Sequence, residues 1–369
     1  MSLKRALFTS VLLSTLVCLP QADKIILNNG EVIEEVTIKS EGLKEVVYDA
    51  GRDKGMTVDS DSVRKIEYEK LPSLVDEAQS AMRGGDPGLA VDTLLAYIEK
   101  YAEKPDSRYG WGPAYASWSV IVLRRQFGDL GGVIEGSKNF VRSFPESRYL
   151  PMVFMSQASA LHQAGEKDEL EKTLAAFRNA ISTQGLSERW SLEADLMEAR
   201  AKGGSLGSQR SALEAIGQKA GTRFPSVAGR ASVAVGEALL ADADKNVSDQ
   251  DRAAKSRAEA EELFEGIVKD ATLDDSTLAG AYAGLGECLF YRGAADSQNV
   301  DTLKLAVRAL LRVPLLYETE SAYVPKALFL AGRSFDMMGD RDRKRQMRRE
   351  LERDYPSSPW TAEAAKLLR

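Results

Sequence analysis

The sequence predicts a mostly α fold: an α-solenoid of about seven helical hairpins, preceded by a small all-β, barrel-like module. The main observation is a serine that opens a new helix-like run at intervals of 40, 40, 39, 50, 45 and 37 residues. A period of this size is typical of stacked hairpins, because one hairpin cannot bury its apolar face alone. These serines are Ser107, Ser147, Ser187, Ser226, Ser276, Ser321 and Ser358.

The N-terminal residues 1–22 have the pattern of a secretory signal peptide. Lys4 and Arg5 precede a mostly apolar run of 14 residues that ends at Leu19, and Ala22 offers a small residue before a cut at Asp23. The run is too short for an ordinary membrane-spanning helix. We therefore expect an exported protein of the periplasm or cell envelope.

Two features of this segment leave an alternative open. Pro20 stands third before the expected cut, where signal peptides carry a small residue, so the segment could instead be retained as an anchor. Val17 precedes Cys18, whereas bacterial lipoprotein signals place Gly, Ala or Ser there, which argues against lipidation.

Composition excludes several classes of protein. Hydrophobic residues make up 44% of the chain and charged residues 28%, which is typical of a globular chain rather than a disordered or membrane-spanning one. The net charge is −6, and it becomes −8 once Lys4 and Arg5 are removed. Nucleic-acid binding depends on clustered lysine and arginine, so we expect no nucleic-acid partner.

Residues 23–69 read as β structure and residues 70–369 as helical repeats. Ile25 and Leu27 alternate with other residues, and Asn29–Gly30 is a strong hairpin signal. Five short strands are expected before Leu71–Pro72–Ser73. After that boundary the apolar period changes from two to about 3.6, and about fifteen helices follow.

Proline and glycine mark the expected helix ends. Pro87 and Pro113 suit the first turn of a helix, where a missing N–H costs nothing. An extra polar loop is expected at Asp242 to Arg252, where the serine spacing is widest. The glycines expected in tight turns within hairpins are Gly84, Gly85, Gly128, Gly131, Gly165 and Gly339.

Small residues recur at a fixed offset from the opening serines. Gly236 and Gly286 each stand ten residues after a serine, and Gly332 and Ala158 each stand eleven after one. With the phrase Phe144–Pro145–Glu146–Ser147, this pattern resembles tetratricopeptide-repeat (TPR) proteins of the exported, envelope-associated bacterial type. The β segment resembles small SH3-like or Sm-like barrels.

The resemblance implies a function and a surface. In the family the small residue lets the two helices of a hairpin pack closely, and positions after it face a concave groove. That groove would dock a peptide or helix of a protein partner, so the protein would be a non-enzymatic interaction scaffold. The residues that the resemblance places there are Glu237, Leu240, Glu287, Phe290, Tyr291, Arg333, Asp336, Ser159 and His162.

No catalytic, cofactor or metal site is predicted. The run Gly131–Lys138 approaches a phosphate-binding loop but exchanges its lysine and serine. The alternating acids from Asp242 lack the glycine and glutamate of a calcium loop. The single histidine, His162, argues against a Ser-His-Asp or Cys-His catalytic site. Cys288 reads as a buried core thiol. The alternative from another class is an envelope glycan-binding or glycan-processing protein that uses carboxylates in the groove.

Two further clusters have a structural and a functional interpretation. Tyr109, Trp111, Tyr115 and Trp118 suit core packing first and a partner surface second. Arg341 to Arg353 suits an exposed helix laced with ion pairs rather than a phosphate patch.

The signal pattern makes a direct prediction about the exported protein. Cleavage after Ala22 should give an intact mass that begins at or near Asp23. Mass spectrometry of the exported protein tests this. A mature chain that still carried Met1 would instead support a retained anchor.

Overall fold

The computed structural model describes residues 22–102, 106, 108–295 and 300–368, so the expected signal peptide lies outside the described residues except for Ala22. Within them the chain forms five strands followed by fifteen helices, as the sequence predicted. The change from strands to helices falls between Glu67 and Ser73. None of the described helices combines the length and apolar character needed to cross a bilayer.

The strands form one antiparallel sheet in the order β4-β3-β2-β1-β5, so β1 lies between β2 and the last strand. Ile25, Val36 and Val46 are buried on its inner side. A single 3₁₀ turn, Ser60–Ser62, connects β4 to β5. The strands are β1 (Asp23–Leu27), β2 (Val32–Glu41), β3 (Glu45–Ala50), β4 (Asp53–Asp59) and β5 (Val63–Glu67).

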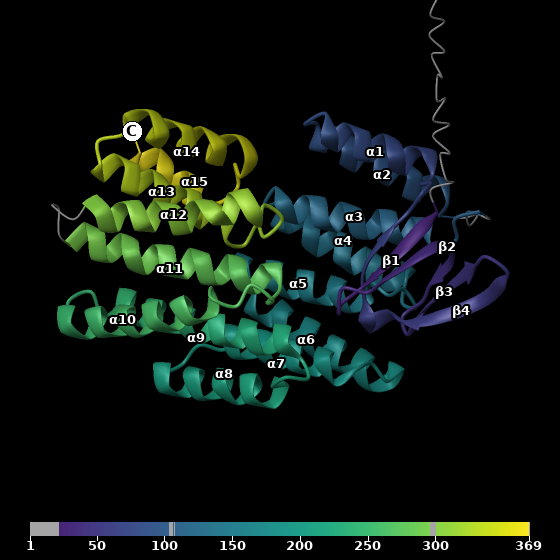
Figure 1. The fold of residues 1–369 in the computed structure, drawn as a ribbon, viewed down its shortest axis with the longest axis horizontal. Coiled ribbons are helices and arrows are strands. Elements are labelled where there is room, and N and C mark those ends of the chain that lie inside the picture. Colours follow the sequence, from purple (N-terminus) through teal and green to yellow (C-terminus); the bar gives the residue numbers. More distant parts are fainter. Residues whose placement is uncertain (1–21, 103–105, 107, 296–299, 369) are drawn as a thin grey trace, which may run out of the picture.

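The helices pair in order as seven hairpins, and a single helix closes the chain (Figure 1). They are α1 (Ser73–Arg83), α2 (Pro87–Lys100), α3 (Gly112–Gln126), α4 (Leu130–Ser143), α5 (Leu150–Ala164), α6 (Lys167–Gln184), α7 (Glu188–Ala201), α8 (Leu206–Ala220), α9 (Pro225–Lys245), α10 (Gln250–Ile267), α11 (Asp275–Ala295), α12 (Val300–Leu316), α13 (Val324–Met337), α14 (Arg341–Asp354) and α15 (Pro359–Leu367).

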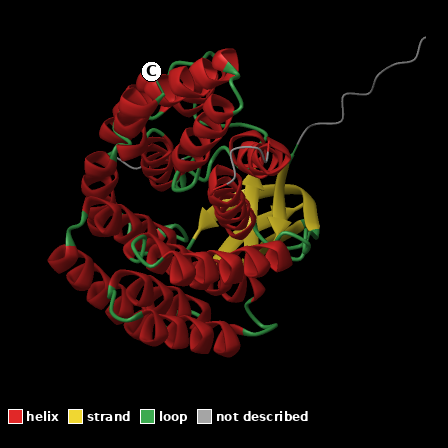
Figure 2. Cartoon of the chain, turned by 90° about the vertical axis from the view of Figure 1, so that its left-hand side faces the viewer, coloured by secondary structure: helices red, strands yellow, loops and turns green. Residues whose placement is uncertain are grey.

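The odd-numbered helices from α3 to α15 form a continuous layer, in which each contacts the next odd-numbered helix. The even-numbered helices pack on this layer from outside. Figure 2 shows the hairpins following a curve, with the sheet beside the early helices. The curve is tight enough to bring the start of α13 and the α14–α15 turn against α3, α4 and α5, around a cavity of about 60 Å³.

Turn chemistry fixes the hairpins. Gly85, Gly128 and Gly339 have φ of +79°, +70° and +77°, a left-handed conformation that suits glycine. At each of these turns the next residue, an aspartate, caps the second helix by accepting a backbone N–H. Gly131 instead lies inside α4, and the long polar loop expected at Asp242 is shorter, because α9 continues to Lys245.

The described serines mark the repeat, but most of them do not cap a helix, and Ser107 lies outside the described residues. Ser358 accepts the N–H of Trp360 and caps α15. Ser226 and Ser276 instead lie within the first turns of α9 and α11.

The predicted close contacts within hairpins are present. A Cβ on Gly286 would lie 2.5 Å from Cγ of Leu310 on α12. One on Gly332 would lie 3.4 Å from Cβ of Met347 on α14, within its hairpin, and 2.7 Å from Cδ1 of Leu368, which follows α15. A Cβ on Gly236 would meet the ring of Phe264 on α10. Ala158 is fully buried in α5. These positions are therefore close-packing points.

The sheet is joined to the helices by a buried polar group and a set of stacked rings. Glu41 accepts hydrogen bonds from the hydroxyls of Tyr68 and Tyr149, the latter at 2.7 Å, and pairs with Arg148 at 3.5 Å. Trp111 stacks on Tyr68 with ring centroids 4.1 Å apart. Burial raises the pKa of the Glu41 carboxyl, although Arg148 and the two hydroxyls oppose the shift.

The aromatic cluster predicted at 109–118 belongs to this junction. Trp111 is buried, Tyr115 packs edge-on against it, and Trp118 stacks on Tyr149. A second link is the indole N–H of Trp190 on α7, which donates to Asp61 at 2.7 Å. These rings act as core, in line with the structural interpretation.

Replacing Gly286 with leucine should destabilise the fold. The larger side chain would overlap Leu310, and overpacking costs about 1–3 kcal/mol. The matched control is Gly207→Leu in α8, where an added Cβ meets nothing within 4 Å. Thermal unfolding of both variants measures the difference. Equal melting of the two would mean that the α11–α12 contact is not a close-packing point.

Glu41→Ala should also be strongly destabilising, because it leaves the buried Arg148 guanidinium without its carboxylate. Losing one partner of a buried pair costs about 3–5 kcal/mol. Glu41→Gln, which keeps an oxygen for the Tyr149 hydroxyl, should lose less. Chemical denaturation of the three proteins compares them, and unchanged unfolding of the alanine variant would contradict the role given to this pair.

The pH dependence provides a separate test. Since the native pKa of Glu41 is raised, its contribution to stability is fully present in acid and is lost as pH rises through that pKa. Glu41→Gln should remove this decline from the pH–stability profile.

Candidate functional site

The inner layer carries a connected polar group from α5, α7, α9 and the start of α13. Arg200 on α7 pairs with Glu237 on α9 at 2.6 Å, and its guanidinium also meets the hydroxyl of Tyr323 beside α13. Burial raises the pKa of Tyr323 to about 12. His162 ends α5 beside this group, and burial, with Arg200 as a second cause, lowers the pKa of its imidazole. The shift favours the neutral form of the imidazole.

A second inner group lies on α11 and its neighbours. Lys326 on α13 pairs with Glu287 at 2.5 Å. Arg257 lies 4.2 Å from the ring centroid of Tyr291 and pairs with Asp244 at 3.2 Å. Burial raises the pKa of Glu287, with the Lys326 charge opposing it. Each carboxylate here has a cation beside it, so its charge is used within the protein.

The structure brings most of the nine predicted contact residues to this inner layer, but not all to its surface. Leu240, Glu287 and Phe290 are buried, at 5%, 3% and 6% exposure. We correct the expectation that they are free to contact a partner, because α9, α11 and α13 pack too closely to leave them open. Glu287 in particular is a buried ion-pair partner rather than an exposed charge.

The remaining predicted residues are partly accessible and mostly engaged. Asp336 pairs with Lys344 at 2.8 Å. Arg333 lies 6.0 Å from the ring centroid of Phe290. Ser159 accepts from Gln163 at 3.2 Å and lines the small cavity where the two ends of the curve meet.

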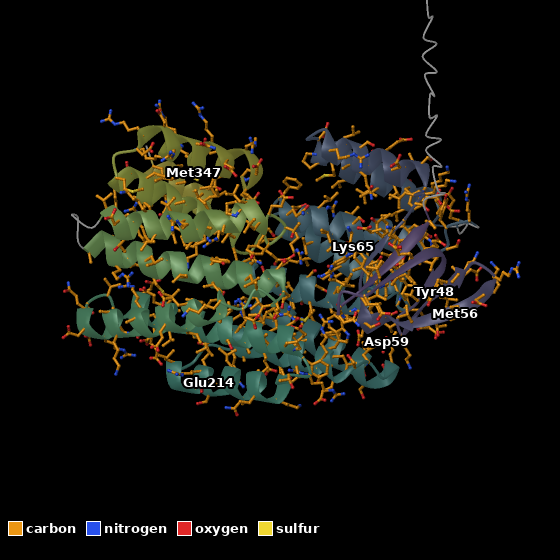
Figure 3. The ribbon with its side chains drawn as sticks, in the orientation of Figure 1. Tyr48, Met56, Asp59, Lys65, Glu214 and Met347 are labelled. Atoms are coloured by element: carbon orange, nitrogen blue, oxygen red, sulfur yellow. The ribbon has the colours of Figure 1, made fainter. Side chains whose placement is uncertain are left out.

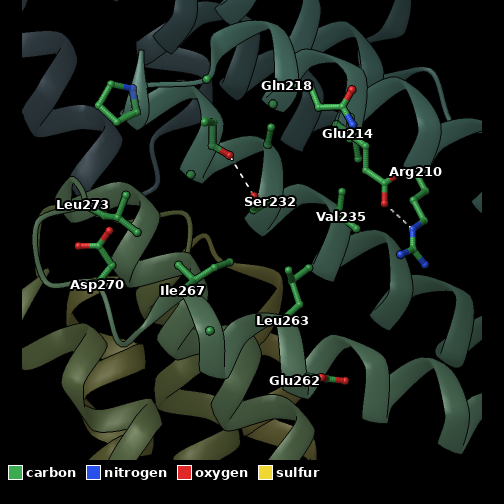
Figure 4. Close-up of a pocket in the computed structure, with 18 of the residues that line it drawn as sticks. Arg210, Glu214, Gln218, Ser232, Val235, Glu262, Leu263, Ile267, Asp270 and Leu273 are labelled. Carbon is green, nitrogen blue, oxygen red and sulfur yellow. Dashed lines mark hydrogen bonds and ion pairs between the residues drawn. The ribbon is translucent and has the colours of Figure 1, made fainter. Parts of the chain in front are cut away.

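A large cavity lies on the outer face, between α8 and α10, with α9 as its floor (Figure 4). It is an open groove of about 900 Å³. Val235 and Leu239 form its floor, while Leu263 and Ile267 line the α10 side. The residues that line it are Arg210, Leu213, Glu214, Gly217, Gln218, Gly221, Thr222, Pro225, Ala228, Gly229, Ala231, Ser232, Val235, Leu239, Glu259, Glu262, Leu263, Gly266, Ile267, Asp270 and Leu273.

Glycines lie in both walls of the groove. Gly217 lies in α8 and Gly266 in the last turn of α10, and a Cβ on Gly266 would meet nothing within 4 Å. A Cβ on Gly217 would instead lie 3.5 Å from Cβ of Ala231 on α9, so only Gly266 faces open space in the groove. Sequence reasoning missed this site, although these two glycines on otherwise amphipathic helices were the available signal.

The rim of the groove is acidic. Glu214, which projects from α8 (Figure 3), pairs with Arg210 at 2.6 Å, and Glu259 from α10 pairs with the same guanidinium. Glu262 has no ion-pair or hydrogen-bond partner within the described ranges, and Asp270 accepts only from Thr272. One cation therefore faces four carboxylates around an apolar floor.

The two segments that approach a phosphate-binding loop and a calcium loop have structural roles. Gly131–Lys138 lies inside α4, with no strand before it. Asp242 accepts from Arg252, Ser256 and Asn246, which accounts for its buried carboxylate. Within the described residues, no group of three or more His, Cys, Asp or Glu could hold a metal ion.

The arginine-rich segment forms α14, whose exposed arginines are largely paired. Arg345 pairs with Asp342 at 2.6 Å and Arg348 with Glu352 at 2.7 Å. Cys288 is buried, and burial raises its thiol pKa, so it is unreactive.

Comparison with known proteins gives likenesses in structure but none in sequence. No known protein family matches the chain, and no curated protein matches it. Among solved structures, the chain is similar to a tetratricopeptide repeat protein from Parabacteroides merdae, with 14% sequence identity and a TM-score of 0.41. The match covers 80% of this chain and 97% of the other.

Proposed function

We propose that this protein is a non-enzymatic scaffold that docks an amphipathic helix of a protein partner in the outer groove between α8 and α10. The observation that carries the proposal is the groove itself: about 900 Å³, with an apolar floor and a charged rim. Helix-in-groove recognition uses such a floor for apolar side chains spaced three or four residues apart. The α8 wall runs from Arg210 to Gly221, about 17 Å of helix, which accommodates three turns of a partner.

The rim favours a basic partner helix. Arg210 is already neutralised by Glu214 and Glu259, so Glu262 and Asp270 remain to attract lysine or arginine. Complementary rim charges chiefly raise the rate of association and select the partner. The partner therefore combines an apolar stripe with flanking cations.

The inner face supports docking less well than the resemblance to TPR proteins implied. The charges there are already engaged, Arg200 with Glu237 and Lys326 with Glu287, so they are less available to a ligand. The glycan alternative requires unpaired carboxylates across a cleft, whereas Glu237 and Glu287 of the described inner layer each have a cation beside them. From the N-terminal pattern we also propose that this chain is exported and that its partner lies in the cell envelope.

The test is a groove-filling substitution that leaves the interior untouched. Gly266→Leu should place a side chain in the groove while keeping or slightly raising the melting temperature, because the added Cβ meets no atom and glycine is a poor helix residue. The probe is a labelled synthetic helix with leucines at a three-to-four spacing and flanking lysines. Its affinity should fall at least about tenfold, a loss of about 1.4 kcal/mol in binding free energy.

Gly207→Leu is the matched control, because it makes the same change on α8 outside the groove. Its binding should equal that of the parent protein, and a peptide of the same composition in scrambled order should bind neither. Equal binding by the Gly266 and Gly207 variants would rule out this groove as the docking site.

A further inference from the structure

We propose that a second outer groove, between α4 and α6 over α5, binds an acidic segment of peptide in extended form. It is a separate site from the α8–α10 groove and does not depend on the function proposed for it. The cavity has a volume of about 510 Å³. It is lined by Glu135, Lys138, Val141, Arg142, Phe154, Gln157, Lys172, Thr173 and Ala176.

The floor holds polar side chains that make no hydrogen bond within the described part of the protein. Gln157 on α5 is only 6% exposed, and its amide has no hydrogen-bond partner among the described residues. Thr173 on α6 is 7% exposed and also lacks one within that part of the chain. Neither is among the fully buried polar groups without a partner, so their polar atoms keep contact with solvent. Both side chains line the cavity, so a ligand placed there would replace solvent as their hydrogen-bond partner.

The rim is cationic, in contrast to the other groove. Lys138 and Arg142 come from α4, and Lys172 comes from α6 on the opposite wall. Glu169 bridges the two walls, at 2.8 Å from Lys172 and 3.8 Å from Lys138. Against three cations stand only Glu135 and Glu169, so the walls favour a negatively charged occupant.

The combination of floor and rim points to peptide rather than to a simple anion. The Gln157 carboxamide offers one acceptor and two donor hydrogens, which match the N–H and C=O of a peptide group. Val141, Phe154 and Ala176 give apolar contact that a small inorganic anion could not use. Carboxylates on the same peptide would then reach the lysines at the rim.

The experiment measures binding of a fluorescein-labelled peptide of alternating glutamate and glycine to the whole protein. Parent protein should bind it, and more weakly as salt rises. The double variant Lys138→Gln with Lys172→Gln should lose at least about fivefold in affinity, since both rim charges are removed. Gln157→Leu should lose about threefold or more in affinity while melting close to the parent temperature, because the polar side chain that it replaces makes no hydrogen bond within the described part of the protein.

The matched control is Lys304→Gln on α12. Lys304 pairs with Asp301 at 2.9 Å, three residues away, just as Lys172 pairs with Glu169, but it lies outside the groove. Unchanged binding by this variant supports the site. The proposal is overturned if the parent does not bind the peptide, if Lys304→Gln weakens it as much as the rim variant, or if Gln157→Leu leaves affinity unchanged. An oligothymidylate of equal charge that bound with the same dependence on Gln157 would also overturn it in favour of a general polyanion site.

Discussion

The architecture depends on how closely the two helices of a hairpin can approach. Where Gly236, Gly286 and Gly332 face a neighbouring helix, a side chain on any of them would overlap a buried residue. This contact lets the odd-numbered helices form one continuous inner layer, as an array of hairpins requires. The even-numbered helices lie on a wider radius, and the gaps between them become the two grooves.

The sheet and helices are held together by a different kind of contact. Glu41 carries a buried carboxyl group with three partners. Tyr68 follows β5, and Arg148 and Tyr149 immediately precede α5. Such a group adds little net stability by itself, but removing one member is costly, so it fixes how the two parts fit. The stacked rings of Tyr68 and Trp111 supply the apolar area beside it.

The sequence was sufficient for the repeat and its close-packing glycines, because both leave a periodic trace along the chain. The sequence also predicted the strands, from the Asn29–Gly30 hairpin signal and the alternation of Ile25 and Leu27. It did not predict which of the expected contact residues are buried. Leu240 and Phe290 are buried because the curvature of the helical array decides which side chains stay open. That curvature is the sum of small packing angles between successive helices, which the local sequence does not reveal. The ion pairing of Glu287 with Lys326, 39 residues later, was invisible for the same reason.

The small cavity where α13 and the α14–α15 turn meet α5 changes how the array should come apart. In an open array each unit touches only its neighbours, so the ends fray first and energies add along the chain. Here the last hairpin also rests against the second and third. Loosening either end removes support from the other, which couples the termini of the array into one cooperative unit. An array that is linear in sequence is therefore expected to unfold as a closed, cooperative unit rather than from its ends.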